Sequence, residues 1–210
     1  MNKKVLVVSY LPSGEYSNTK KLLDYFLAKV NNAEIEHLNL IETPPDFFGY
    51  EAMSAYYSRN YNGKELTASQ QKAIAPMDKM CEQMLKADIV VLAHPMHNFG
   101  IPGIVKTWFD SVLQKGKAFD YGANGPFGML TDKKALSIYT SGGSYTNDKV
   151  TTDYPNWNTL KFLTKINFGF AGFNEAEVIG ASTANPEKLE ANLSEAKKEI
   201  DRVIAKWFHN

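Results

Sequence analysis

The sequence predicts an α/β fold in which a five-stranded parallel sheet is covered by helices on both faces. Five short runs of strand length are bounded by turn residues, and apolar residues recur at helical spacing between them. This alternation is typical of β-α-β units joined by right-handed crossovers. The 210 residues contain no obvious linker, so we expect one domain spanning residues 1–210.

The first β-α unit is predicted at the N-terminus. Residues 4–9 form an apolar run of strand length, and a helical apolar pattern starts after Ser17. Ser17 and Thr19 are residues that cap helices, and a helix N-terminus favours an anion through its free amides and dipole. Ordinary capping explains the same residues, and neither the dinucleotide nor the triphosphate glycine fingerprint is present.

The second strand is expected at residues 33–41. Periodicity then fails from residue 46 to residue 66, although six aromatic residues occur there. They are Phe47, Phe48, Tyr50, Tyr56, Tyr57 and Tyr61. An ordered loop or short helices over a pocket or subunit interface explain them better than a disordered linker. A capping box from Thr67 to Gln70 predicts the start of the next helix.

The third strand is predicted at residues 88–93, and a loop stiffened by prolines follows it. Its candidate contact residues are Pro95, Met96, His97, Asn98 and Phe99. They offer a soft contact, a titratable ring, an amide and an aromatic face, which together suit a flat ring rich in nitrogen and oxygen. Pro102 is well placed as the first residue of the following helix.

A second candidate ligand loop follows the fourth strand, which is predicted at residues 134–140. It contains Thr140, Ser141, Gly142, Gly143 and Tyr145. Paired glycines let backbone amides approach a ligand closely, although they also occur in ordinary turns. Residues 115–130 are predicted as a loop able to cover a ligand. The candidates for the substrate pocket are Phe119, Tyr121 and Asn124 of this loop, together with Tyr145.

Three further elements complete the pattern. They are a helix marked by Trp157, Leu160, Leu163 and Ile166, a strand at residues 177–181, and a final helix after Asn185 and Pro186. Five strands without a glycine fingerprint favour the flavodoxin-like order 2-1-3-4-5, whose reversal point lies between the first and third strands. The loops after strands one, three and four are then expected to converge on one crevice.

The composition argues against several classes of protein. Lysine plus arginine and aspartate plus glutamate both total 23, so nothing indicates a nucleic-acid surface. No apolar run reaches the roughly 18 residues of a membrane helix, and the start lacks a secretory pattern, so we expect a cytoplasmic protein. The single cysteine, Cys81, is predicted to be a buried hydrophobe, and the histidines show no metal-site spacing.

With these motifs in place, the chain resembles FMN-dependent NADH-azoreductases and related NAD(P)H:quinone dehydrogenases of flavodoxin-like fold. The resemblance covers nearly the whole chain and is most specific at residues 16–19, 95–99, 124–126 and 140–143. It implies that the FMN phosphate is held by Ser9, Ser17, Asn18 and Thr19. It also implies that residues 95–99 and 140–143 contact the isoalloxazine ring.

The resemblance implies a homodimer with flavin sites at the subunit interface. The expected reaction is a ping-pong transfer of hydride from NAD(P)H, with NADH favoured, to quinones and aromatic azo compounds. The resemblance favours FMN as the cofactor. FAD is the less favoured alternative, because FAD-dependent quinone reductases share a similar loop followed by Pro102 and Trp108. The alternative is an electron carrier or FMN-binding interaction protein without turnover, although such carriers are typically shorter and strongly acidic.

His97 departs from the family pattern, which usually has tyrosine there, and the arginine often found before the glycine pair is also missing. An imidazole, with an ordinary pKa of about 6.5, is able to donate a proton to a reduced substrate. Alternatively, His97 only directs its ring edge at the flavin. We favour the second interpretation, because tyrosine is a poor acid at neutral pH.

Overall fold

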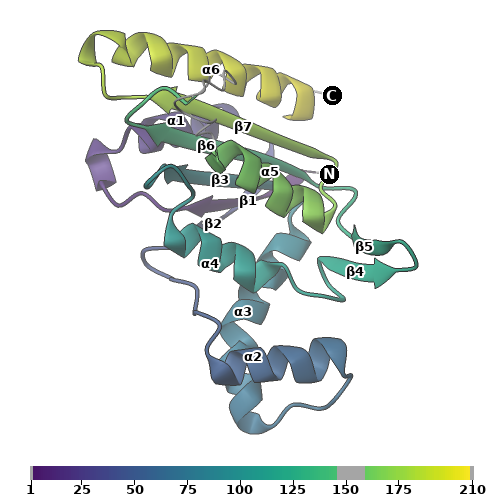
Figure 1. Cartoon of the computed structure of the whole chain (residues 1–210). Coiled ribbons are helices and arrows are strands. Elements are labelled where there is room, and N and C mark those ends of the chain that lie inside the picture. The colour runs from purple at the N-terminus through teal and green to yellow at the C-terminus, as the bar shows by residue number, and fades with distance from the viewer. Residues whose placement is uncertain (1, 146–158, 209–210) are drawn as a thin grey trace.

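The computed structural model describes residues 2–145 and 159–208. Its main sheet has five parallel strands in the order β2-β1-β3-β6-β7, with helices on both faces (Figure 1). The strands of this sheet are β1 (Lys3–Ser9), β2 (Ala33–Asn39), β3 (Ile89–Pro95), β6 (Lys134–Ser141) and β7 (Glu175–Ser182). The α-helices are α1 (Asn18–Lys29), α2 (Tyr50–Tyr56), α3 (Ala68–Lys86), α4 (Gly103–Val112), α5 (Thr159–Ala171) and α6 (Pro186–Phe208). The flavodoxin-like fold with strand order 2-1-3-4-5 is therefore confirmed.

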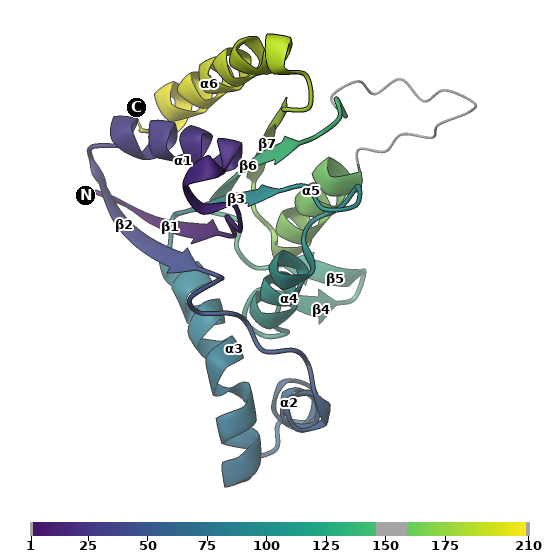
Figure 2. The ribbon, with the colours of Figure 1, turned by 90° about the vertical axis from the view of Figure 1, so that its left-hand side faces the viewer.

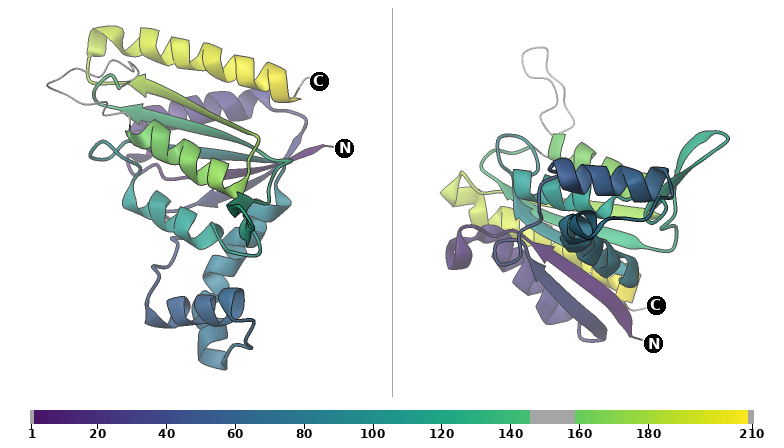
Figure 3. Two further views of the ribbon diagram at one scale, coloured as in Figure 1. Left: turned by 45° about the vertical axis from the view of Figure 1, so that its right-hand side comes forward. Right: turned by 90° about the horizontal axis from the view of Figure 1, so that it is seen from below.

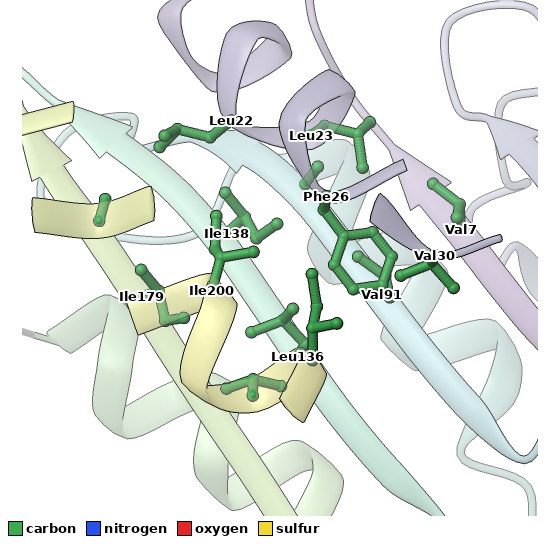
Figure 4. Packing of buried hydrophobic residues seen from close by; sticks show 14 of the residues in the cluster. Val7, Leu22, Leu23, Phe26, Val30, Val91, Leu136, Ile138, Ile179 and Ile200 are labelled. Atoms are coloured by element: carbon green, nitrogen blue, oxygen red, sulfur yellow. The ribbon is translucent and has the colours of Figure 1, made fainter. Parts of the chain in front are cut away.

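Two hydrophobic cores hold the layers together, one on each face of the sheet. Helices α1 and α6 cover one face, where Leu22 and Phe26 of α1 and Ile200 of α6 pack on the strands (Figures 2 and 4). Helices α3, α4 and α5 cover the other face around Trp108 and Phe168. The three central strands, β1, β3 and β6, are almost fully buried on both faces, as expected for a parallel sheet, whereas the edge strand β2 is largely exposed.

The central position of β1 creates the reversal point that the sequence predicts. Strand β1 pairs with β2 on one side and with β3 on the other. The chain leaves β1 for α1, on one face of the sheet, but leaves β3 for α4, on the opposite face. The two connections diverge, and a crevice is expected at the carboxyl ends of these strands.

The segment from residue 115 to residue 130, which the sequence predicts as a loop able to cover a ligand, is partly regular. It contains an antiparallel hairpin of β4 (Phe119–Gly122) and β5 (Gly125–Gly128). A Cβ at Gly128 would lie only 2.1 Å from the amide nitrogen of Gly172, so the backbones touch where α5 ends. This contact fixes the hairpin beside the amino ends of the strands, as Figure 3 also shows. The turn-rich composition concealed strands that are only four residues long.

The aromatic segment of residues 46–66 folds into short helices, which is one of the two forms that the sequence predicts. Helix α2 continues into a π-helical turn, η2 (Tyr57–Tyr61), and the pair packs beside the start of α3, away from the sheet (Figure 1). Arg59 forms an ion pair with Asp78 of α3, and Lys117 binds the same carboxylate at 2.8 Å. This polar network fastens the segment to the body of the protein.

Smaller predictions have mixed outcomes. The Thr67–Gln70 capping box is present, and Cys81 is buried, which raises the pKa of its thiol to about 11. Pro102 precedes α4 as its N-cap, so its prediction as the first helical residue is wrong by one position. Leu163 and Ile166 of α5 are exposed, and Trp157 lies outside the described residues. No helix among the described residues is long and apolar enough to cross a membrane.

Candidate functional site

Three loops meet at the carboxyl edge of the sheet, and direct hydrogen bonds tie them together. The amide of Tyr10, after β1, donates to the carbonyl of Ala93 at 2.9 Å, and the amide of Met96 donates to the carbonyl of Thr140 at 2.8 Å. The buried hydroxyls of Thr19 and Thr140 lie 2.7 Å apart and join α1 to β6. The structure thus brings the three predicted loops into one continuous surface.

The loop after β3 is a tight, strained turn. The amide of His97 donates to the carbonyl of Gly100, and the amide of Gly100 donates back to the carbonyl of His97. Between them, Asn98 has a φ of 45° and Phe99 a φ of 69°, a combination typical of a type I′ turn. Asparagine tolerates this conformation, but phenylalanine does not do so readily, so the turn stores strain at the site.

The position of Phe99 is supported by two contacts. Its carbonyl accepts a hydrogen bond from the hydroxyl of Thr159 at the start of α5, and its ring meets that of Tyr145 edge-on at 5.9 Å. The Phe99 side chain remains 43% exposed. An aromatic ring is thus held at the edge of the crevice in spite of an unfavourable backbone.

The loop after β6 turns its carbonyl groups into the protein. The carbonyl of Gly142 accepts from the amide of Ala184, and that of Gly143 accepts from the hydroxyl of Ser141 at 2.8 Å. A Cβ at Gly142 would meet no heavy atom within 4 Å, so this residue faces open space. The two glycine amides are therefore the groups that this loop can offer to a ligand.

The start of α1 forms the third wall. The hydroxyl oxygen of Ser17 caps the helix by accepting from the amide of Lys20 at 3.1 Å. The amides of Asn18 and Thr19 have no acceptor within the helix, as in the first turn of any helix. Their free N–H groups and the helix dipole favour an anion here.

Two of the predicted phosphate residues are already engaged inside the protein. Ser9 is buried, and its hydroxyl lies 2.9 Å from Nε2 of His37. Thr19 is fully buried, and its hydroxyl contacts Thr140. Asn18 is better placed to meet a ligand, because it is half-exposed. Ser17 is also buried, and its hydroxyl oxygen is used as the cap of α1, which leaves its hydroxyl hydrogen as the group that it can donate.

The predicted substrate residues divide into two groups. Tyr145 belongs to the three-loop site, where its ring lies against Gly143 and Phe99. Phe119, Tyr121 and Asn124 lie in the β4–β5 hairpin at the opposite edge of the sheet (Figure 1). Within one chain, the structure does not bring the hairpin to the crevice.

His97 is exposed at the crevice, and its ring meets that of Tyr10 edge-on at 5.7 Å. Sequence reasoning missed Tyr10, which joins two of the loops through its amide and its ring. Its position directly after the first strand was the available signal.

His94, in contrast, is completely buried beneath the loop. Its Nδ1 lies 3.0 Å from the carbonyl of Pro95, which can only accept, so the proton is assigned to Nδ1. Burial is the main cause that lowers the pKa of His94 to about 4, and it outweighs the Pro95 contact. The imidazole is therefore neutral at physiological pH, as expected for a structural histidine.

A separate cavity of about 570 Å³ lies between the end of β2 and α3. Its walls include His37, Asn39, Glu42, Pro76 and Met80. It is large enough for a small molecule, but it contains none of the three loops that meet at the reversal point. We therefore place the candidate site at the loops.

Comparisons with known proteins place the chain among flavoenzymes. The sequence profile of a family described as flavodoxin-like fold matches residues 3–204. An FMN-dependent NADH:quinone oxidoreductase from Psychromonas ingrahamii is 33% identical over 192 residues, which are 89% of this chain and 87% of the relative. One from Shewanella oneidensis is also 33% identical, over 95% of this chain and 98% of its own.

Solved structures agree with the sequence relatives. An azoreductase from Bacillus anthracis superposes with a TM-score of 0.84 at 27% identity and covers 99% of this chain and 100% of its own. An FMN-dependent NADH-azoreductase from the same species, solved in complex with FMN, has a TM-score of 0.80 and 31% identity. That match covers 97% of this chain and 99% of the solved chain.

The strain at Phe99 predicts an unusual order of stability. Phe99→Gly should have a free energy of unfolding about 1 kcal/mol above that of Phe99→Ala, because glycine adopts positive φ without a steric penalty. Both variants lack the ring, so its contacts cancel in the comparison. Urea unfolding of the two purified proteins measures the difference. An alanine variant that is the more stable of the two would show that the turn is not strained.

The buried His94 predicts acid sensitivity. The unfolded chain binds a proton at a pKa of about 6.5, but the folded protein binds one only at about 4, so acid favours unfolding between these values. Lowering the pH from 6.5 to 4 should cost the wild type about 3 kcal/mol more than His94→Gln. Denaturant unfolding across this range provides the measurement, and parallel pH profiles would contradict the assignment.

Proposed function

The chain belongs to the family of FMN-dependent NADH:quinone oxidoreductases of flavodoxin-like fold, and we propose that it transfers hydride from NADH to quinones and aromatic azo compounds. The observation that carries this proposal is the junction of three ligand-type loops at the reversal point of the sheet. Two relatives that match most of the chain are named NADH:quinone oxidoreductases, and two solved structures that match nearly all of it are named azoreductases. A cytoplasmic location stays a prediction from the sequence.

The residues of the three loops fit the chemistry of FMN. The start of α1, with the Ser17 hydroxyl and the amides of Asn18 and Thr19, would hold the phosphate. Gly142 faces open space, as a backbone must where a flat ring approaches it. Pro95, Met96 and the turn at Asn98 and Phe99 would form the wall on the other side of the ring.

When bound, FMN supplies the acceptor and donor of hydride, so that NADH and the oxidised substrate can react in turn in the same space. This is the basis of the proposed ping-pong order. The protein contributes position and charge. The peptide units that carry the Gly142 and Gly143 amides are fixed, because their carbonyls, on Ser141 and Gly142, accept from the amides of Thr183 and Ala184. These two glycine amides would stabilise negative charge at the pyrimidine edge of the ring.

The exposed aromatic residues support a homodimer. Phe162, Ile166 and Phe170 of α5 and Tyr121 and Phe127 of the hairpin are large apolar side chains on adjacent elements. A surface of this kind on a protein of this size indicates an interface. In a two-fold dimer, the hairpin of one subunit would reach the flavin site of its partner, which would bring the exposed Tyr121 and Asn124 to Tyr145. Phe119 is buried against Phe170 of its own chain and would support the hairpin from within.

The function is tested by anaerobic titration of the purified protein. Bound FMN should be identified by its yellow spectrum, NADH should bleach it, and a quinone or azo dye should restore the colour. Protein without flavin, and unable to bind added FMN, would refute the proposal. Flavin that NADH cannot bleach would instead favour an electron carrier or interaction protein.

The role of His97 is decided by a conservative replacement. We expect His97→Tyr to keep quinone turnover within about threefold of wild type, because the imidazole serves as a ring at the crevice and not as an obligatory acid. The measurement is kcat for quinone reduction between pH 5.5 and 8.5. A loss of about 100-fold or more, together with a changed pH profile, would identify His97 as the proton donor.

The interface is tested by introducing charge into it. Phe162→Glu and Ile166→Glu should convert the wild-type dimer into a monomer of 23.5 kDa and strongly reduce quinone turnover. Lys165→Glu, on the same helix, changes charge without removing an apolar side chain and serves as the control. Light scattering after gel filtration measures the mass, and a wild-type protein that is monomeric would contradict the dimer.

A further inference from the structure

Four buried polar side-chain atoms have no hydrogen-bond partner in the described part of the chain. They are His94 Nε2, Trp108 Nε1, Ser137 Oγ and Thr164 Oγ1. Buried polar atoms in proteins nearly always bond to protein or to ordered water. Four unpartnered atoms in one protein layer therefore require a physical explanation.

All four residues lie in the layer between one face of the sheet and the helices that cover it. His94 lies two residues after Leu92 on β3, and Ser137 pairs with Leu92 across to β6, so the three side chains share one face. Leu92 and Trp108 belong to the core between the sheet and helices α3, α4 and α5. The polar atoms thus lie inside this layer and not on two separate sides.

Thr164 of α5 lies level with Ser137. Leu160, one helical turn before Thr164, belongs to the same small cluster as Tyr139, which follows Ser137 by two positions on β6. Phe168, one turn after Thr164, belongs to the same core as Ala135, which precedes Ser137 by two positions. Four helical residues rise about 6 Å and two strand residues about 6.6 Å, so the two hydroxyl residues face each other.

The hydrogen-bonding capacities of the four atoms are complementary to water. Because Nδ1 of His94 donates to Pro95, its Nε2 is an acceptor, whereas Nε1 of Trp108 is only a donor. The hydroxyls of Ser137 and Thr164 can do both. Burial keeps the pKa of His94 low, so the cluster carries no charge that would call for an ion.

We propose that His94, Trp108, Ser137 and Thr164 form a buried water site directly beneath the loop of residues 95–99. Water there accepts from Trp108, donates to His94 and exchanges hydrogen bonds with the two hydroxyls. It fixes the imidazole, whose Nδ1 holds the carbonyl of Pro95, and so makes His94 a positioning residue for the loop. The water site stands independently, whereas its effect on FMN rests on the proposed function.

The water site is tested by a double-mutant cycle on the two hydroxyls. If they share water, Ser137→Ala and Thr164→Val should each lower the melting midpoint by about 2–4 °C, and the double variant should lose less than the sum. If the hydroxyls are dry and unpartnered, removing either should leave the midpoint unchanged or raise it. That result, or strictly additive losses, would overturn the proposal.

The effect on the loop is measured by FMN binding to the same variants. The Ser137→Ala/Thr164→Val double variant should bind FMN about 5- to 10-fold more weakly and shift the flavin absorption bands, although neither residue belongs to the loops. Ser111→Ala is the matched control, because it removes a buried hydroxyl that bonds only within α4, to the carbonyl of Thr107. The control should lose stability but keep its FMN affinity and spectrum.

Equal loss of FMN affinity in Ser111→Ala, or unchanged affinity in the double variant, would overturn the positioning role of His94. Wild-type protein that binds no FMN would refute the proposed function, while the melting cycle would still decide the water site. A crystal structure of the protein provides the direct check, since density for water bonded to Ser137 and Thr164 is expected.

Discussion

The candidate site depends on one constraint, the central place of β1 between β2 and β3. Because α1 and α4 leave neighbouring strands toward opposite faces, their connecting loops separate and leave room at the carboxyl edge. Hydrogen bonds from Tyr10 to Ala93 and from Met96 to Thr140 then hold the loops in register. The walls of the crevice are thus extensions of the sheet, which makes them rigid before any ligand arrives.

Strain and burial are concentrated in the wall after β3. Phe99 keeps a backbone conformation that costs energy, and the neutral His94 sits beneath the same loop in a fully buried layer. Neither feature improves the stability of the fold. Both features have a reason if the loop must hold an aromatic ring and a fixed backbone against a flat cofactor. They then lower the stability of the fold but improve the binding of the cofactor.

Much of this architecture follows from local sequence patterns. Apolar runs locate the five strands of the main sheet, and the Thr67–Gln70 box locates the start of α3, because these signals act over a few residues. The β4–β5 hairpin was missed because its strands are short and are fixed by a distant backbone contact, between Gly128 and Gly172. The candidate site also combines local and distant contributions. The positions of its loops follow from the sequence pattern, but the hydrogen bonds of Ser9 with His37 and of Thr19 with Thr140 join segments that are far apart in the sequence.

Hydrogen exchange of the purified protein with and without FMN tests whether the three loops form one flavin site. If they do, FMN should slow exchange together in the backbone amides of residues 16–20, 95–100 and 141–145. Exchange around Glu42 and Lys79, which line the separate cavity beside β2, should show no comparable change. Protection confined to a single loop, or centred on that cavity, would show that the three loops do not form one flavin site.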